Sequence, residues 1–246
     1  MDYTAIVVAG SGLFLAGMLK GTTGLGYSSC ALPFLVPIVG IKAAISILII
    51  PVLTSNLQVV FTAGHFSETV KRFLHLYLSM IPGIGIGIFA LNALDARISG
   101  AFLGLVIVAY AVFAILRPPW QLTSLAEKKL QIPVGILNGF VTGLTGSQVM
   151  PLFPYIMSLG LDANRLVQAI NVAVTLATVI LALGLFSIGA ITTGSAFLSA
   201  MAIVPAMAGV SLGSCLRSYI PIAHFRLLVL AVLFAMGCSL LYTSIL

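Results

Sequence analysis

Charged residues are scarce in this sequence. Lys, Arg, Asp and Glu make up 7% of the 246 residues, and only five of them are acidic. A typical soluble domain carries roughly a quarter charged residues. No soluble fold of this length can hide a composition that is 61% hydrophobic, because much of any folded surface stays in contact with water. We therefore expect a chain embedded in a lipid bilayer, with no soluble domain attached.

Clusters of metal-binding or catalytic residues are missing as well. The three cysteines, Cys30, Cys215 and Cys238, lie far apart in or beside apolar segments, without a metal or redox spacing. No nucleophile-plus-base spacing and no phosphate-binding loop is present, so we expect no enzymatic activity, no metal and no cofactor. The net charge of +6 does not indicate nucleic-acid binding, because the basic residues are scattered at the ends of apolar runs instead of clustered.

Long apolar runs are what the sequence does contain. A transmembrane helix needs roughly 20 mostly apolar residues. Six segments satisfy this, at about 43–63, 73–92, 98–116, 165–185, 190–214 and 225–245. Two further stretches, 3–40 and 132–159, are apolar but interrupted by polar centres rich in Gly, Thr and Ser. Irregular backbone at membrane depth survives only where it is buried in protein or faces water, so each stretch is predicted to form a discontinuous helix or a re-entrant hairpin.

The two halves of the sequence repeat each other. The matching residues are Gly17, Gly21, Thr23 and Gly24 with Gly139, Gly143, Thr145 and Gly146, residues 32–34 with 153–155, and Gly83 and Gly87 with Gly209 and Gly213. Small residues four apart let helix backbones approach closely in lipid, so the last set is assigned to helix packing. We predict an all-α membrane protein with two transmembrane repeats, 1–117 and 132–246, joined by a linker, 118–131.

The distribution of Lys and Arg favours one of two topologies. If each interrupted stretch crosses the membrane once, the basic residues divide five against five. If each stretch returns to the side from which it enters, eight lie together and only Lys42 and Arg97 lie opposite. The eight are Lys71, Arg72, Arg117, Lys128, Lys129, Arg165, Arg217 and Arg226. Basic loops are cytoplasmic, so we predict the second arrangement, with the eight-span topology as the alternative.

In this topology each repeat is a hairpin followed by three spanning helices. Three is an odd number, so the second repeat is inverted relative to the first, and the two polar turns can meet near the midplane, where many secondary transporters bind substrate. In this topology the linker is predicted to be cytoplasmic and both termini to face outward.

Lys20 is the charged residue that lies deepest within a predicted membrane stretch, and no Asp or Glu lies at similar depth. A lone buried cation is costly and usually paired or functional, so an anionic ligand is the expected partner; snorkelling to the interface is the alternative. The polar centres offer N–H and hydroxyl donors, which suit an oxyanion, unless the hydroxyls bond within their own helices. The predicted substrate-binding residues are Lys20, Thr22, Thr23, Gly24, Gly26, Ser28, Ser29, Thr142, Thr145, Gly146, Ser147, Gln148 and Asn171.

The paired motifs resemble those of a known family. Residues 17–33 and 139–154 each carry a glycine-containing broken helix followed by an apolar residue and proline. This pattern, which extends over nearly the whole chain, is similar to that of the TauE/SafE family of sulfite and organosulfur-anion exporters. The resemblance implies a bacterial plasma-membrane permease for small sulfur oxyanions or sulfonates. Residues 24–27 and 147–148 depart from the glycine run common in that family, so the resemblance does not identify the particular substrate.

We therefore expect a secondary transporter that exports a small anion by alternating access, with its site between the hairpins. The membrane potential alone can expel an anion, because moving one charge through 100 mV releases about 2.3 kcal/mol; coupling through His75 or a sodium ion is an alternative. An anion channel and a non-transporting assembly subunit are the alternative functions. The expected partners are the anion and the lipid bilayer, with no nucleic acid, and a homodimer is compatible with the sequence.

Overall fold

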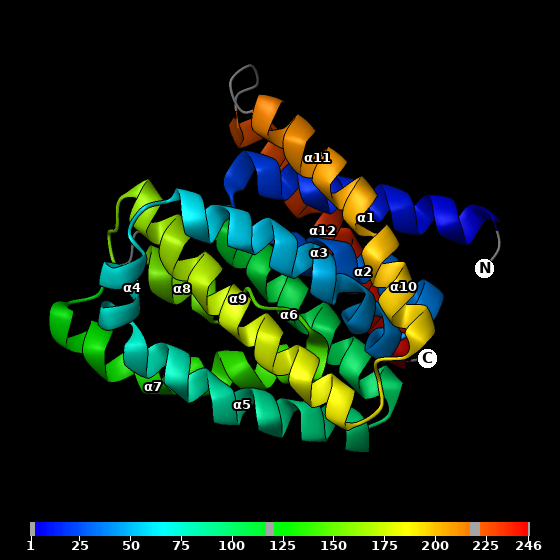
Figure 1. Ribbon diagram of the computed structural model, residues 1–246, viewed down its shortest axis with the longest axis horizontal. Coiled ribbons are helices and arrows are strands. Elements are labelled where there is room, and N and C mark those ends of the chain that lie inside the picture. The colour runs from blue at the N-terminus through cyan, green and yellow to red at the C-terminus, as the bar shows by residue number, and fades with distance from the viewer. Residues whose placement is uncertain (1–2, 117–120, 217–221, 246) are drawn as a thin grey trace.

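The structure, a computed structural model, describes residues 3–116, 121–216 and 222–245, and these form helices without any strand (Figure 1). This confirms the prediction of an all-α polytopic membrane protein. In chain order the helices are α1 (Tyr3–Thr23), α2 (Tyr27–Val39), α3 (Ile41–Thr62), α4 (Phe66–Arg72), α5 (Leu74–Ala93), α6 (Ala96–Leu116), α7 (Ser124–Thr145), α8 (Leu152–Met157), α9 (Ala163–Ser187), α10 (Thr193–Met201), α11 (Ile203–Leu216) and α12 (Ile222–Ile245). Because α7 begins at Ser124, the second part of the predicted linker 118–131 is helical.

Six described segments are long and apolar enough to cross a bilayer. They are Tyr3–Thr23, Ile41–Thr62, Leu74–Ala93, Ala96–Leu116, Ala163–Ser187 and Thr193–Leu216. Five of these coincide with predicted segments, the last one divided into α10 and α11. The first segment was not predicted as a separate span. α1 continues for 21 residues before the helix ends, which is a full membrane-spanning length.

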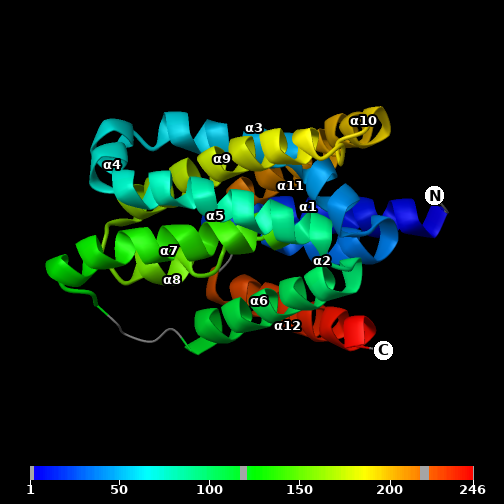
Figure 2. The ribbon, with the colours of Figure 1, turned by 90° about the horizontal axis from the view of Figure 1, so that it is seen from below.

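The two interrupted stretches fold back on themselves. α1 packs against α2, and α7 packs against α8. α1 begins and α2 ends at the end of the molecule that holds both termini, whereas α7 begins and α8 ends beside α4 (Figures 1 and 2). We call these ends the terminal end and the α4 end. The description of the two repeats as an inverted pair stays a prediction.

Two pairs of helices join the two halves of the chain. α1 packs along α11, and α5 packs along α7, so the first helix of each half lies against a helix of the other half. Glycines four apart line both contacts, and a Cβ added to any of them would overlap the partner's backbone. These glycines are Gly17 and Gly21 of α1 against Gly209 and Gly213 of α11, and Gly139 and Gly143 of α7 against Gly83 and Gly87 of α5. The packing role predicted for glycines of this spacing is therefore confirmed.

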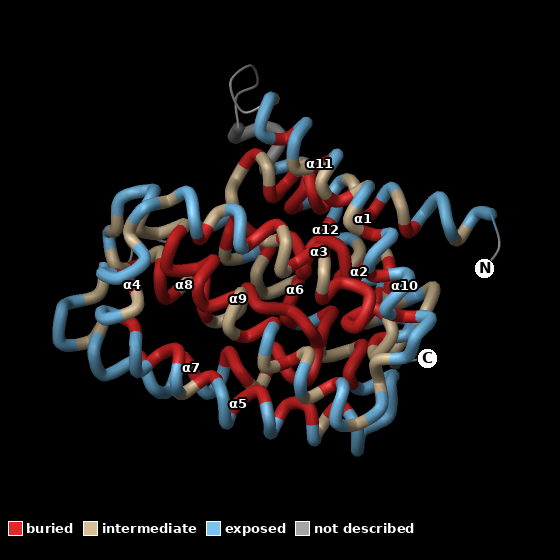
Figure 3. The backbone as a smooth tube through the Cα atoms, in the orientation of Figure 1, coloured by how far each residue is buried: buried red, intermediate tan, exposed pale blue. Residues whose placement is uncertain are grey.

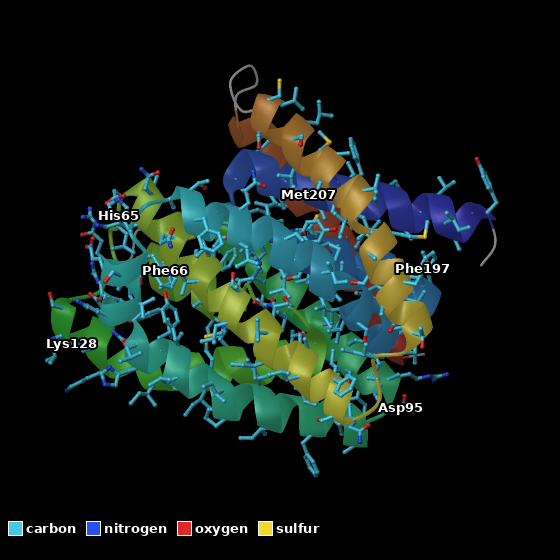
Figure 4. The ribbon with its side chains drawn as sticks, viewed as in Figure 1. His65, Phe66, Asp95, Lys128, Phe197 and Met207 are labelled. Carbon is cyan, nitrogen blue, oxygen red and sulfur yellow. The ribbon has the colours of Figure 1, made fainter. Side chains whose placement is uncertain are left out.

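Buried backbone lies in the middle of the molecule, and the two ends are mostly exposed (Figure 3). His65 and Lys128 lie at the α4 end, and Asp95 lies at the terminal end (Figure 4). At the α4 end the Arg72 guanidinium makes two hydrogen bonds to Glu127, of 2.7 and 2.9 Å, which tie α4 to α7. Of the basic residues predicted to share this end, Arg117 and Arg217 lie outside the described residues, as does the side chain of Arg226.

Candidate functional site

The two helix breaks are built by the same local device. α1 ends at Thr23 and α7 ends at Thr145, and each is followed by a glycine with positive φ, Gly24 (φ 77) and Gly146 (φ 73). This left-handed conformation favours glycine because it has no Cβ. Each threonine donates its hydroxyl to the carbonyl four residues earlier, at 2.7 Å in both cases, and accepts the backbone N–H two residues later. The sequence repeat therefore becomes a repeat of local structure at the two breaks.

The two breaks meet inside the protein. The hydroxyls of Ser29 and Ser147 lie 2.9 Å apart, although the residues belong to different halves. From α9, the side-chain amide of Asn171 donates to the carbonyl oxygen of Gly24 at 3.1 Å. Both serines and Asn171 are nearly inaccessible to solvent. The backbone between α1 and α2 is thus held against the second half by polar contacts, as expected of irregular backbone within a membrane protein.

Lys20 lies one turn before the first break, and its side chain is only 3% exposed. Its ammonium group donates to the Oδ1 atom of Asn171 at 2.8 Å and to the Oδ1 atom of Asn56 on α3. No described acidic side chain forms an ion pair with it. Two neutral amide oxygens use two of the three donors of the ammonium and leave its charge without a counter-charge.

The first turn of α2 faces the same space. Gly26 precedes this helix with φ 83, and no side chain caps its first turn. Gly26, Ser28 and Ser29 line a buried cavity together with Lys20. The first N–H groups of a helix have no partner within the helix, and they carry partial positive charge that attracts anions. Donors from the helix terminus and a cation are therefore brought to one place.

Four of the predicted hydroxyls are engaged with nearby backbone. Thr22 and Thr23 donate to the carbonyl oxygen of Leu19, and Thr145 donates to that of Val141. Thr142 donates at 3.3 Å to the carbonyl oxygen of Ser147, across the second break. These threonines stabilise the helix ends, and none of them lines the buried cavity, which does include the predicted residues Gln148 and Asn171. Gly24 lines a neighbouring vestibule instead.

Space around Lys20 is unequal on its two sides. A vestibule of about 280 Å³ reaches Lys20 and Gly24 between the end of α3, the end of α11 and the start of α9, where Gln58, Ser214 and Asn164 line it. Beyond Lys20 the buried cavity measures only about 10 Å³, which is room for roughly one water molecule.

On the other side of the breaks the structure is closed. A second cavity of about 10 Å³ is enclosed mostly by apolar side chains, among them Leu32, Ile45, Leu48, Ile49 and Leu181. We call these five residues the apolar seal. They belong to α2, α3 and α9, and all are less than 10% exposed. The site is thus accessible toward the α4 end and closed toward the terminal end.

Two polar residues of the candidate site, Asn56 and Thr178, are not among the predicted substrate-binding residues. Asn56 contacts Lys20 directly, and Thr178 accepts a hydrogen bond of 3.1 Å from Gln148. Both lie in long apolar helices, where polar residues also join helices without touching a ligand. Their only signal is polarity within an apolar run. No cluster of metal-binding side chains is present in the described part of the chain.

Comparison with known proteins points to one family. The sequence model of the family described as "Sulfite exporter TauE/SafE" matches residues 9–240. No curated protein and no solved structure gives a significant match. The matched residues include both helix breaks, Lys20 and every residue that lines the buried cavity.

Proposed function

The chain belongs to the sulfite exporter TauE/SafE family, and on that premise we propose that it exports a small sulfur oxyanion or sulfonate by alternating access. The proposed binding site lies where the two helix breaks meet. Lys20, Asn56 and Asn171 form one side of it, and the first turn of α2 with Gln148 forms the other.

The uncompensated charge of Lys20 is the observation that carries this proposal. Taking an ammonium group out of water costs several kcal/mol even in a relaxed protein, unless a counter-charge and hydrogen bonds replace the water. Here two amide oxygens supply hydrogen bonds, but no described carboxylate supplies charge. A bound monoanion would neutralise Lys20 and would also accept hydrogen bonds from the uncapped N-terminus of α2.

Alternating access is supported by the unequal space on the two sides of Lys20. The vestibule of about 280 Å³ is large enough for a small oxyanion, whereas the cavity beyond Lys20, at about 10 Å³, is not. An anion can therefore reach the ammonium from the α4 end but cannot pass the apolar seal without movement of the surrounding helices. The positive-φ glycines at the breaks, Gly24, Gly26 and Gly146, are the positions at which the backbone can bend most easily.

The proposed direction of export is supported by the charge distribution. Lys71, Arg72, Lys128, Lys129 and Arg165 all lie in the segments at the α4 end. Basic segments of this kind face the cytoplasm, so the vestibule opens to the cytoplasm and the seal faces outward. An interior-negative membrane potential then drives an anion outward with about 2.3 kcal/mol per charge per 100 mV.

The proposal is tested with purified protein in liposomes. Sulfite loaded inside the liposomes should leave when a potential is applied, and the flux should saturate with concentration and show counterflow by unlabelled substrate. A flux that rises linearly and shows no counterflow would identify a channel instead. If sulfite, sulfonates and other small anions all fail to move, the protein does not transport them.

A further inference from the structure

Gln148 has one end of its side-chain amide fixed and the other end free. It lines the buried cavity and is only 3% exposed. Its Nε2 atom donates to the hydroxyl of Thr178 at 3.1 Å. Its Oε1 atom has no hydrogen-bond partner among the described residues. An unpaired buried oxygen costs about 1–3 kcal/mol, so this atom is expected to receive a donor when the site is occupied.

The hydroxyl of Thr178 determines which end of the amide is free. Thr178 donates its single proton to the carbonyl oxygen of Val174 at 2.7 Å, so its oxygen can only accept from Gln148. If the amide were turned over, Gln148 Oε1 would face the hydroxyl oxygen of Thr178, and neither atom would have a proton to donate to the other. The orientation of an amide is assigned from its hydrogen-bond network, and this network leaves the oxygen, not the nitrogen, as the free end of Gln148.

The remaining polar groups of the cavity are mainly donors. Lys20 contributes one positive charge, and the Nδ2 atom of Asn56 is a second buried donor without a described partner. The uncapped first turn of α2 adds backbone N–H groups. Among the described residues, no carboxylate and no second cation lines the cavity. Within this part of the chain, the site therefore offers one positive charge, several donors and the hydroxyls of Tyr27, Ser28 and Ser29, which can donate or accept. Gln148 Oε1 differs from these hydroxyls because it is a free oxygen that can only accept, and an ordinary oxyanion cannot satisfy it.

We propose that the site selects a singly charged sulfur oxyanion that itself donates a hydrogen bond, and that Gln148, oriented by Thr178, recognises this donor. Hydrogensulfite and hydroxyalkyl sulfonates have this chemistry. Sulfate does not, because it carries two charges and would direct only lone pairs at Gln148 Oε1. This inference rests on the proposed function and specifies the substrate class of the same site.

Two pairs of monoanions test the effect of a hydrogen-bond donor on binding, because the members of each pair have similar size and the same charge. The compact pair is hydrogensulfite, at slightly acidic pH, and methanesulfonate; the extended pair is isethionate and propane-1-sulfonate. In each pair only the first member has a donor. Binding to the purified protein is measured as the ligand-induced rise in melting temperature and by competition for counterflow in liposomes. We expect the donor-bearing member of whichever pair binds to do so about tenfold more tightly, since its partner leaves Gln148 unpaired.

Variants test whether Gln148 causes the preference. Gln148→Met keeps the length of the side chain but removes the amide oxygen, leaving only a weakly accepting thioether, and should equalise the two members of the pair. Thr178→Val frees the amide to turn over and should weaken the preference severalfold, while Thr178→Ser should restore it. Thr175→Val is the matched control, because Thr175 makes the same kind of bond to a carbonyl of α9, at 2.7 Å, whereas the amide of Gln148 donates to Thr178.

The outcomes distinguish this inference from the proposed function. Equal binding of the two members of a pair by the wild-type protein would overturn the inference and leave anion transport intact. A preference that survives in both Gln148→Met and Thr178→Val would also overturn it. If no member of either pair binds or moves, the proposed function itself fails.

Discussion

Replacing Lys20 with methionine should remove anion binding while leaving the fold intact. Methionine has nearly the same length and fills the same apolar path along α1, but it has no charge. Removing one partner of a buried charge pair costs about 3–5 kcal/mol, which weakens binding by about 150-fold or more. Asn171 keeps the hydrogen bonds of its Nδ2 atom to Gly24 and Val167, which hold α9 against the first break. Asn56 loses its described hydrogen bond from Lys20, so the variant without ligand should melt at a lower temperature, and the ligand-induced shift is measured against that value.

The effect can be measured as a smaller ligand-induced rise in melting temperature. At a ligand concentration about 100 times the dissociation constant, wild-type protein gains about 2.7 kcal/mol. For a chain of this size that corresponds to a rise in melting temperature of roughly 5–10 °C. With binding weakened about 150-fold, the same concentration stabilises Lys20→Met by only about 0.3 kcal/mol, or about 1 °C.

Lys42→Met serves as the control for net charge. Lys42 lies at the start of α3 at the terminal end, where its ammonium donates to Asn92 at 3.2 Å in an exposed position. This variant should keep the full ligand-induced shift. A Lys20→Met protein that kept a shift of several degrees with sulfite or a sulfonate would refute the placement of the anion at Lys20.

Two further predictions concern the frame of the site. Gly83→Ala should lower the melting temperature strongly, because its Cβ would overlap a carbonyl oxygen of α7, whereas Gly85→Ala on the same helix meets no atom within 4 Å and should be neutral or stabilising. At the α4 end, hydrogen bonds and charge from Arg165 hold the pKa of Glu68 and of Asp162 below their usual values. Their contribution to stability is therefore present above the usual carboxyl pKa values and is lost as pH falls through the lowered ones. Arg165→Gln should flatten this acid-side loss in melting curves recorded as a function of pH, and an unchanged curve would contradict the ion-pair assignment.

The two helix breaks of the candidate site and the buried position of Lys20 could be predicted from sequence because both leave a strong signal. Gly24 and Gly146 mark the breaks because few other residues adopt a positive φ, and Lys20 stands out because lone charges within apolar runs are rare. The individual roles of the hydroxyls could not be predicted. Thr23 and Ser29 lie six positions apart in the same polar centre, yet one completes its own helix end and the other reaches the second half. Only the three-dimensional placement of the turns separates these roles.

The places of Asn56 and Thr178 in the candidate site could not be predicted from sequence for a different reason. Apolar residues surround both of them in the chain, and a helix buried on several faces carries little periodicity to show which face holds a ligand. The pairing of helices across the two halves could not be predicted from sequence either. Equivalent glycines of the two halves indicate close packing, but they do not say that α1 pairs with α11 and α7 with α5.

The two helix pairs, α1 with α11 and α5 with α7, connect movement of the helices to the proposed anion site. At their glycines, α1 contacts α11 and α5 contacts α7 backbone to backbone, so each pair is expected to move as one body. Each pair ends in a break, at Gly24 for the first and Gly146 for the second. A displacement of one pair against the other would therefore act directly on the Ser29–Ser147 contact and on the small cavity beside Lys20. Separation at that contact would enlarge the cavity, and under the proposed alternating access this is the change that lets an oxyanion pass from the vestibule toward the apolar seal.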